Sequence, residues 1–125
     1  MSWTEFDNDM KQVFGKNFNS VDELYYNVTA EINFGEEREL DDNEALKYLQ
    51  DLHIMHGRLC AITDFCYEKE CGPFVIDADE MNKFVDTFYL TYGEAFYSTD
   101  IVIINFEERL IWVLFHEGVC WLSEG

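Results

Sequence analysis

The chain has 125 residues, a length typical of one domain, and 48% of them are hydrophobic, including 11 Phe, 7 Tyr and 3 Trp. So many aromatic residues exclude a disordered acidic tail. The 26 acidic residues against 8 basic ones give a net charge of −18. This charge excludes a surface that binds nucleic acid or anionic membranes, because such surfaces need clustered Lys and Arg. It favours basic partners.

The first half of the chain predicts amphipathic helices. Ser2 and Glu5 form a capping-box pattern, and apolar residues at helical spacing follow it over residues 3–14. A second pattern of this kind, which begins at Ser20, predicts a helix over residues 21–32. Both helices would end at glycines.

Two more helices are predicted further along the chain. Asp41 or Asp42 is a suitable cap for the third, whose apolar stripe runs towards Gly57. Asp77 opens the fourth, and Gly93 ends it. Between them, residues 59–67 fit either a strand or a short helix, and residues 74–76 favour a short strand after a turn at the only proline.

The C-terminal third predicts an antiparallel meander with strands over residues 101–106, 110–115 and 119–122, the last two joined by a two-residue turn at Glu117 and Gly118. The middle strand is apolar on both faces, which predicts helices on one face and another cover, such as a partner chain, on the other. A homodimer would follow if residues 110–115 or Trp121 lay at a sheet edge.

The predicted fold class is therefore α+β, with about four amphipathic helices on a small antiparallel meander. We expect one domain over residues 1–125, helical over 1–57, mixed over 58–99 and formed by the meander over 100–123.

One run of the chain is especially acidic. On a helix, acids three or four residues apart are separated by about 4.5–6 Å along the axis, and duplex DNA carries one charge per roughly 1.7 Å of its axis. A row of carboxylates can thus imitate phosphates and bind a basic protein. The alternative is a solvated loop in which Asp41 and Asp42 only cap a helix. The predicted contact residues are Glu31, Glu36, Glu37, Glu39, Asp41, Asp42 and Glu44, followed by Asp79, Glu80 and Asp86.

Aromatic residues supply a second candidate for partner binding. Tyr and Trp dominate the energetic centres of protein interfaces. Some of these rings would form an apolar centre surrounded by acids, while most would pack in the core. The residues in question are Tyr25, Tyr26, Phe34, Tyr89, Tyr92, Phe96, Tyr97 and Trp121.

Five potential zinc ligands lie close together in the sequence: His53, His56, Cys60, Cys66 and Cys71. Zinc binds Cys and His tetrahedrally, but the gaps here are irregular and lack the tight Cys-x2-Cys spacing of strong zinc patterns. Histidines near a helix end commonly interact with the helix dipole, and free cysteines often only pack. We predict no cofactor, with a small zinc-containing accessory protein as an alternative.

Calcium binding and catalysis have weaker support. Asp77-Ala78-Asp79 resembles the start of an EF-hand loop, but the pattern then fails at Met81. The carboxylate pairs of a glycosidase are expected by chance among 26 acids, and His116 lies beside a predicted turn. The sequence contains no nucleotide-binding glycine loop and no Gly-x-Ser-x-Gly motif. We therefore predict a protein that is not an enzyme.

In size, charge and aromatic content, the whole chain resembles small acidic inhibitors of phage or mobile-element origin, including anti-restriction and anti-CRISPR proteins that act as DNA mimics. It is also similar in composition to acidic immunity proteins that block nuclease toxins. The resemblance implies a non-enzymatic inhibitor that occludes the basic nucleic-acid-binding surface of a partner protein. The alternative is an immunity protein or antitoxin that neutralises a nuclease toxin.

The cytoplasm is the predicted location. Residues 1–5 lack the basic and apolar regions of a signal peptide. The longest apolar runs are too short to cross a bilayer. The four cysteines would stay reduced in this compartment.

Overall fold

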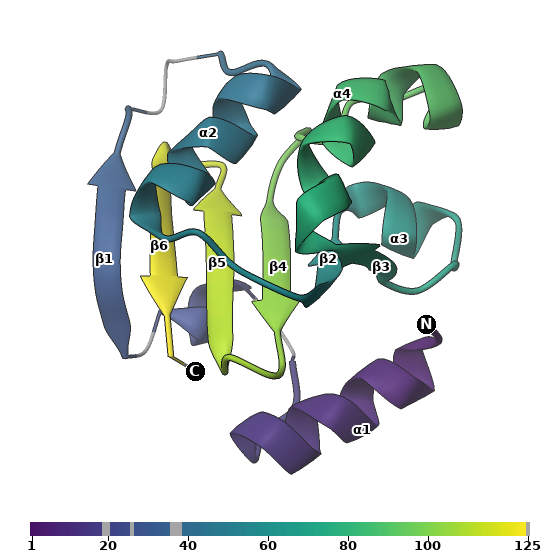
Figure 1. Cartoon of the computed structure of the whole chain (residues 1–125), viewed down its shortest axis with the longest axis vertical. Coiled ribbons are helices and arrows are strands. Elements are labelled where there is room, and N and C mark those ends of the chain that lie inside the picture. Colours follow the sequence, from purple (N-terminus) through teal and green to yellow (C-terminus); the bar gives the residue numbers. More distant parts are fainter. Residues whose placement is uncertain (19–20, 26, 36–38, 125) are drawn as a thin grey trace.

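The computed structural model describes residues 1–18, 21–25, 27–35 and 39–124, and they form an α+β fold around one sheet. All neighbouring strands are antiparallel, in the order β1-β6-β5-β4-β2-β3. Helices cover both faces of the sheet (Figure 1). The strands are β1 (Val28–Asn33), β2 (Arg58–Ile62), β3 (Phe74–Asp77), β4 (Ile101–Asn105), β5 (Leu110–Phe115) and β6 (Val119–Ser123).

The described helices comprise four α-helices and two short 3₁₀ segments. Among the residues that the structure describes, no helix is both long enough and apolar enough to cross a membrane. The α-helices are α1 (Trp3–Phe14), α2 (Asp42–Leu52), α3 (Asp64–Glu68) and α4 (Met81–Tyr92), and the 3₁₀ segments are η1 (Val21–Leu24) and η2 (Ala78–Glu80).

Local signals fix most ends of the long helices as predicted, but α4 begins at Met81, because Asp77 caps the short segment η2 ahead of it. Ser2 and Glu5 form a reciprocal capping box at the start of α1, and Asp41 and Glu44 form another at the start of α2. Gly93 ends α4 in the left-handed conformation, with φ of 80°, which glycine adopts without strain. The helix predicted to run towards Gly57 stops earlier, at Leu52, because the chain becomes extended at His53.

The predicted helix over residues 21–32 is wrong. Only η1 is helical there, and β1 follows it, paired antiparallel with β6. Asn27 breaks the helical path with φ of 51°. Val28 and Ile32 are spaced for one helix face, but in β1 they alternate with exposed Thr29 and Glu31, so the same apolar residues also satisfy a strand. Pairing with β6 decides between the two.

The remaining predicted elements are confirmed with small changes. Residues 59–67 contain both of the alternatives, β2 and then α3. The C-terminal meander forms as predicted, but it is the centre of a larger sheet, flanked by β1 on one side and by β2 and β3 on the other. The turn between β5 and β6 has three residues rather than two, since Phe115 pairs with Val119 and Gly118 takes φ of 86°.

Both faces of the central strand β5 are covered by this chain itself. On one face, Trp112 and Leu114 pack with residues of α2 and α4. On the other, Ile111 and Val113 pack with residues of α1, among them fully buried Phe6. Burial of a side chain such as Phe6 contributes about 1.5–3 kcal/mol to the free energy of unfolding. The second cover is therefore α1 with η1.

This arrangement also bears on the expected homodimer. Strands β5 and β6 lie inside the sheet, and the edge strands are β1 and β3. Trp121 is buried, at 2% exposure. The condition that would favour a homodimer through residues 110–115 or Trp121 is therefore not met.

Candidate functional site: acidic hollows at one end of the sheet

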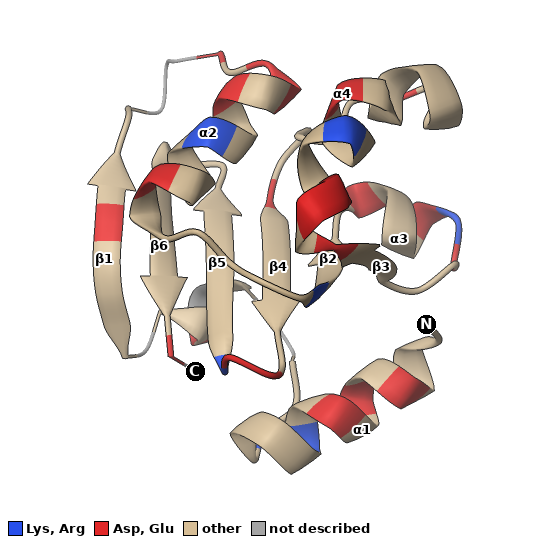
Figure 2. Ribbon diagram, in the orientation of Figure 1, with Lys and Arg blue, Asp and Glu red and all other residues tan. Residues whose placement is uncertain are grey.

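Acidic residues are spread over the helices and loops rather than gathered on one element. Figure 2 shows Asp and Glu on α1, α2, α3 and α4, with Lys and Arg at isolated points between them. Each half of the chain, residues 1–57 and 58–125, holds 13 of the acids and 4 of the bases. Charge alone therefore does not distinguish one surface from another, and a binding site depends on the residues that surround individual carboxylates.

The described acids of the run over residues 31–44 lie on different elements. Glu31 lies on β1, where its side chain is exposed. Glu36 and Glu37 lie outside the described residues. Glu39 is exposed in the segment before α2. Glu31 does not belong to a row of carboxylates spaced along a helix, as helical spacing predicted, because its segment is a strand.

Three acids of the run stabilise the start of α2. The Asp41 carboxylate accepts the Glu44 backbone N–H at 2.8 Å, and the Glu44 carboxylate accepts the Asp41 N–H at 3.4 Å. The Asp42 carboxylate accepts the backbone N–H groups of Phe96 and Tyr97 at 2.8 and 2.9 Å. These bonds cap the helix and attach the segment before β4 to it. Asp42 thus has a structural role, because it joins α2 to the segment before β4.

Asp41 and Asp42 also line a hollow that brings them together with Asp86. The hollow has a volume of about 400 Å³ and lies between the start of α2 and the middle of α4. The Asn43 side-chain amide donates to the Asp86 carboxylate at 3.2 Å, which links the two helices. No Lys, Arg or His is among the described residues that line the hollow.

Aromatic and aliphatic side chains accompany these acids. Tyr89 and Tyr97 line the same hollow. Tyr89 is 64% exposed and its neighbour Leu90 is 86% exposed, the highest value among the large apolar side chains described as exposed. Burial raises the pKa of Tyr97, and a tyrosine hydroxyl is a neutral hydrogen-bonding group at pH 7 even at its ordinary pKa of about 10. An apolar centre beside carboxylates is the arrangement expected of a site that binds protein.

The other predicted acids of this region lie apart from the hollow. Asp79 is exposed in η2, and its backbone N–H is accepted by the Asp77 carboxylate at 3.2 Å. Asp77 therefore acts as a cap, the alternative to a calcium loop. Glu80 lines a separate hollow against β3, together with Lys83, which supplies a positive charge there.

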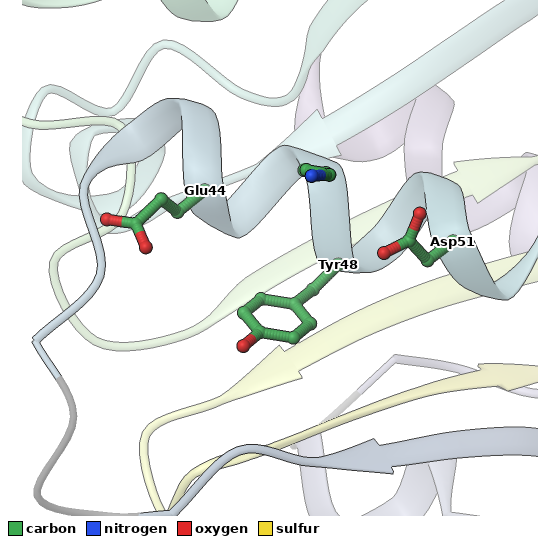
Figure 3. Close-up of a pocket in the computed structure, with 4 residues that line it drawn as sticks. Glu44, Tyr48 and Asp51 are labelled. Carbon is green, nitrogen blue, oxygen red and sulfur yellow. The ribbon is translucent and has the colours of Figure 1, made fainter.

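A further surface hollow runs along α2. Glu44, Lys47, Tyr48 and Asp51 line it (Figure 3), and its volume is about 280 Å³. Tyr48 stacks on Phe34, with ring centroids 5.2 Å apart. Lys47 partly balances the negative charge of Glu44 and Asp51 in this hollow. The hollow should therefore attract a basic partner less strongly than the hollow at Asp86, which has no basic residue among its described lining residues.

The predicted zinc ligands are not brought together. No group of three or more His, Cys, Asp or Glu suited to a metal occurs within the described part of the chain, which includes all five candidates. Cys60 contacts Met1 through sulfur at 3.9 Å, and the buried Cys66 thiol lies 3.7 Å from the Ala61 carbonyl oxygen. Burial raises the pKa of both thiols, which disfavours the thiolate that zinc requires.

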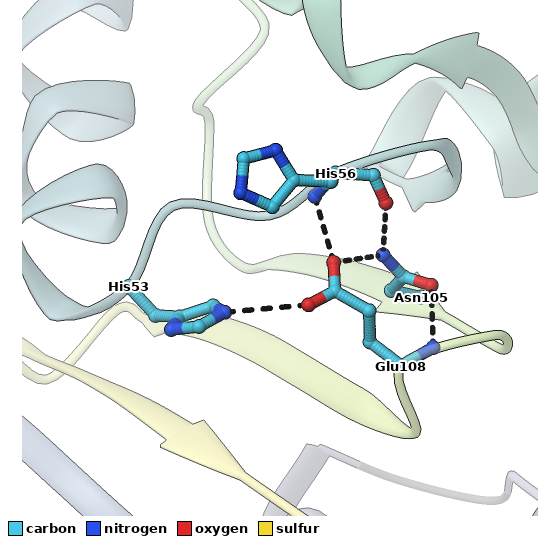
Figure 4. Close-up of polar contacts among 4 residues, drawn as sticks. All are labelled: His53, His56, Asn105 and Glu108. Carbon is cyan, nitrogen blue, oxygen red and sulfur yellow. Dashed lines mark hydrogen bonds and ion pairs between the residues drawn. The ribbon is translucent and has the colours of Figure 1, made fainter.

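The two histidines instead meet the turn between β4 and β5 (Figure 4). The Glu108 carboxylate accepts the His56 backbone N–H at 2.7 Å and the Asn105 side-chain amide at 2.8 Å. That amide also donates to the His56 carbonyl at 2.7 Å. His53 Nε2 lies 3.5 Å from Glu108 Oε2, close enough for an ion pair when His53 is protonated, but the two atoms do not form a hydrogen bond. The network attaches the segment after α2 to the sheet.

His116 has a comparable structural role. Its Nδ1 lies 3.0 Å from the Asp100 carboxylate, which also accepts the His116 backbone N–H at 2.8 Å. The pair joins the β5–β6 turn to the residue before β4.

A second candidate site lies on the opposite face of the sheet, and the sequence did not predict that its residues meet. Tyr25, Phe115 and Trp121 line a hollow of about 480 Å³ together with Glu31 and Glu117. Tyr25 and Trp121 are among the aromatic residues considered above for partner binding. The hollow depends on β1 lying beside β6, and the helix predicted over residues 21–32 would not create it.

Comparisons of the chain with protein-family models, with curated proteins and with solved structures found no match. The candidate sites therefore rest on the chemistry and geometry of this chain.

Proposed function

We propose that this protein is a non-enzymatic inhibitor that binds and occludes a basic, nucleic-acid-binding surface of another protein, in the cytoplasm. The observation that carries the proposal is the hollow between α2 and α4. There Asp41 and Asp86 lie beside Tyr89, and the exposed Leu90 follows Tyr89 on α4. Carboxylates and exposed apolar side chains thus occur at one place on a chain of net charge −18.

The two kinds of side chain contribute differently to binding. The carboxylates and the negative charge of the whole chain attract a basic surface and speed its association. Tyr89 and Leu90 are exposed in the free protein, so their burial against a partner would slow dissociation. A partner surface that normally holds phosphates presents Lys and Arg, which the carboxylates can pair with. Occupation of that surface excludes nucleic acid sterically and electrostatically.

The site can be tested with variants that keep the fold. In Asp41→Asn/Asp86→Asn, two charges are lost, but Asn still caps a helix well and can still bond Asn43. A matched control is Asp7→Asn/Asp9→Asn on α1, which removes the same charge from the other side of the sheet. Partners would be captured from a lysate of the source organism with the wild-type protein and identified by mass spectrometry.

Association rates of the purified partner would then be compared among the variants. We expect the Asp41/Asp86 variant to associate about fivefold more slowly than the Asp7/Asp9 variant, since charges at a contact act mainly on association. Leu90→Ser should instead speed dissociation. If the two double variants associate equally fast, the hollow between α2 and α4 is not the contact site. A partner that binds no nucleic acid would contradict the proposed inhibition.

A further inference from the structure

The hollow on the opposite face of the sheet has an aromatic floor. Trp121 is 2% exposed, and its indole N–H donates to the Leu24 carbonyl at 3.2 Å, which fixes the ring. Tyr25 meets it edge to face, with centroids 5.0 Å apart and planes at 88°. Phe115 lies on the other side of Trp121, with centroids 6.0 Å apart. Tyr25 is 50% exposed, so a ligand can reach it.

Two carboxylates stand beside these rings. Glu31 comes from β1, where it pairs with Trp121 of β6, and Glu117 comes from the β5–β6 turn. The Tyr25 hydroxyl donates to the Glu31 carboxylate at 2.5 Å, and this bond raises the pKa of Tyr25. A carboxylate has about four acceptor sites, so Glu31 can accept further donors. No basic residue is among the described residues that line this hollow.

We propose that this hollow receives the guanidinium group of an arginine side chain from the basic partner. A cation is attracted to the faces of aromatic rings, and carboxylates accept the paired N–H donors of a guanidinium. Arginine fits better than lysine, because its planar group both stacks on rings and bonds two oxygens at once. The net charge of −18 makes a cationic occupant electrostatically favourable.

This proposal rests on the proposed function for the basic character of the partner. Asp41 and Asp42 of the first hollow lie where α2 begins, and Asn33, Phe115 and Glu117 of the second hollow lie where β1 and β5 end. Figure 1 shows these element ends at the same end of the sheet. One partner can therefore contact the hollow between α2 and α4 and reach over this end of the sheet to place an arginine against Tyr25. Among the described strands, β1 is the edge strand on that side.

The site can be tested without the partner by titrating the protein with N-acetyl-arginine amide and following backbone amide signals by NMR. N-acetyl-citrulline amide is the matched neutral probe. We expect saturable shifts at Glu31, Phe115 and Glu117 with the arginine probe and none with the citrulline probe. The variant Glu31→Gln/Glu117→Gln alters exposed side chains and should bind the arginine probe about fivefold more weakly, as expected for two exposed charge pairs. Asp7→Asn/Asp9→Asn should bind it unchanged.

Equal responses to both probes, or equal weakening in both double variants, would overturn the arginine site. The outcome separates the two proposals. If the arginine probe does not bind at this hollow but partner binding still depends on Asp41 and Asp86, the arginine site is refuted and the proposed function stands. Binding of the arginine probe to a protein whose partner never contacts nucleic acid would support the site and refute the inhibition.

Discussion

Replacement of Asp42 by alanine should destabilise the fold, because this carboxylate joins α2 to the segment before β4. It accepts the backbone N–H groups of Phe96 and Tyr97, at 2.8 and 2.9 Å. Phe96 is fully buried and Tyr97 is half-buried, so water replaces the lost acceptor poorly. A hydrogen bond to a charged group contributes about 1.5–3 kcal/mol. Because Asp42 itself is only half-buried, we expect a total loss of about 2–4 kcal/mol in the free energy of unfolding.

A graded series of variants makes this expectation sharper. Asp42→Asn keeps one acceptor oxygen, but its amide NH2 then faces the other backbone N–H, so this variant should lose most of the same stability. Asp41→Ala removes only a helix cap, which is worth about 1 kcal/mol. Glu39→Gln changes an exposed side chain and should stay within about 0.5 kcal/mol of the wild type. Urea denaturation followed by circular dichroism measures all four. If Asp42→Ala were as stable as Glu39→Gln, the structural role assigned to Asp42 would be refuted.

Two further predictions concern titratable side chains. A thiol-specific reagent near pH 8 should rapidly modify Cys71, the exposed cysteine, and should modify Cys60, Cys66 and Cys120 only on unfolding. Burial raises the pKa values of these three thiols, that of Cys120 to about 11. Rapid modification of two or more thiols in the folded protein would contradict these environments. Tyr67 is 52% exposed, and the burial of the rest of its side chain raises its pKa to about 12. The folded state then holds this proton more tightly than the unfolded state, so stability should fall between about pH 10 and pH 12. Tyr67→Phe should flatten that fall, and identical profiles would show that Tyr67 does not titrate as described.

The sequence predicted the features of the fold that depend on neighbouring residues. Ser2 with Glu5, and Asp41 with Glu44, form the expected caps because each capping box closes within one helical turn. Strand β1 was not predictable in this way. The spacing of Val28 and Ile32 suits a helix as well as a strand, and pairing with distant β6 decides the outcome.

The candidate sites followed the same rule. Charge and composition pointed to the acidic surface, but the position of Asp86 beside Asp41 depends on α4 packing against α2. The hollow at Tyr25 depends on the β1–β6 pair. Conversely, histidines and cysteines that are close in sequence are not grouped in the fold, because they lie on different elements: Cys60 lies on β2, while Cys71 lies in the exposed loop before β3.

In the proposed inhibition, the acidic surface replaces nucleic acid on a basic partner. The most direct measurement is competition: a fluorescent DNA duplex bound to the captured partner is titrated with this protein at salt concentrations from about 50 to 500 mM. We predict that the protein displaces the duplex in a one-to-one manner and that its affinity falls steeply as salt rises, because at 0.1 M salt attraction between exposed charges more than about 10 Å apart is largely screened. A partner that binds the duplex and this protein at the same time, with an affinity insensitive to salt, would refute the proposed inhibition.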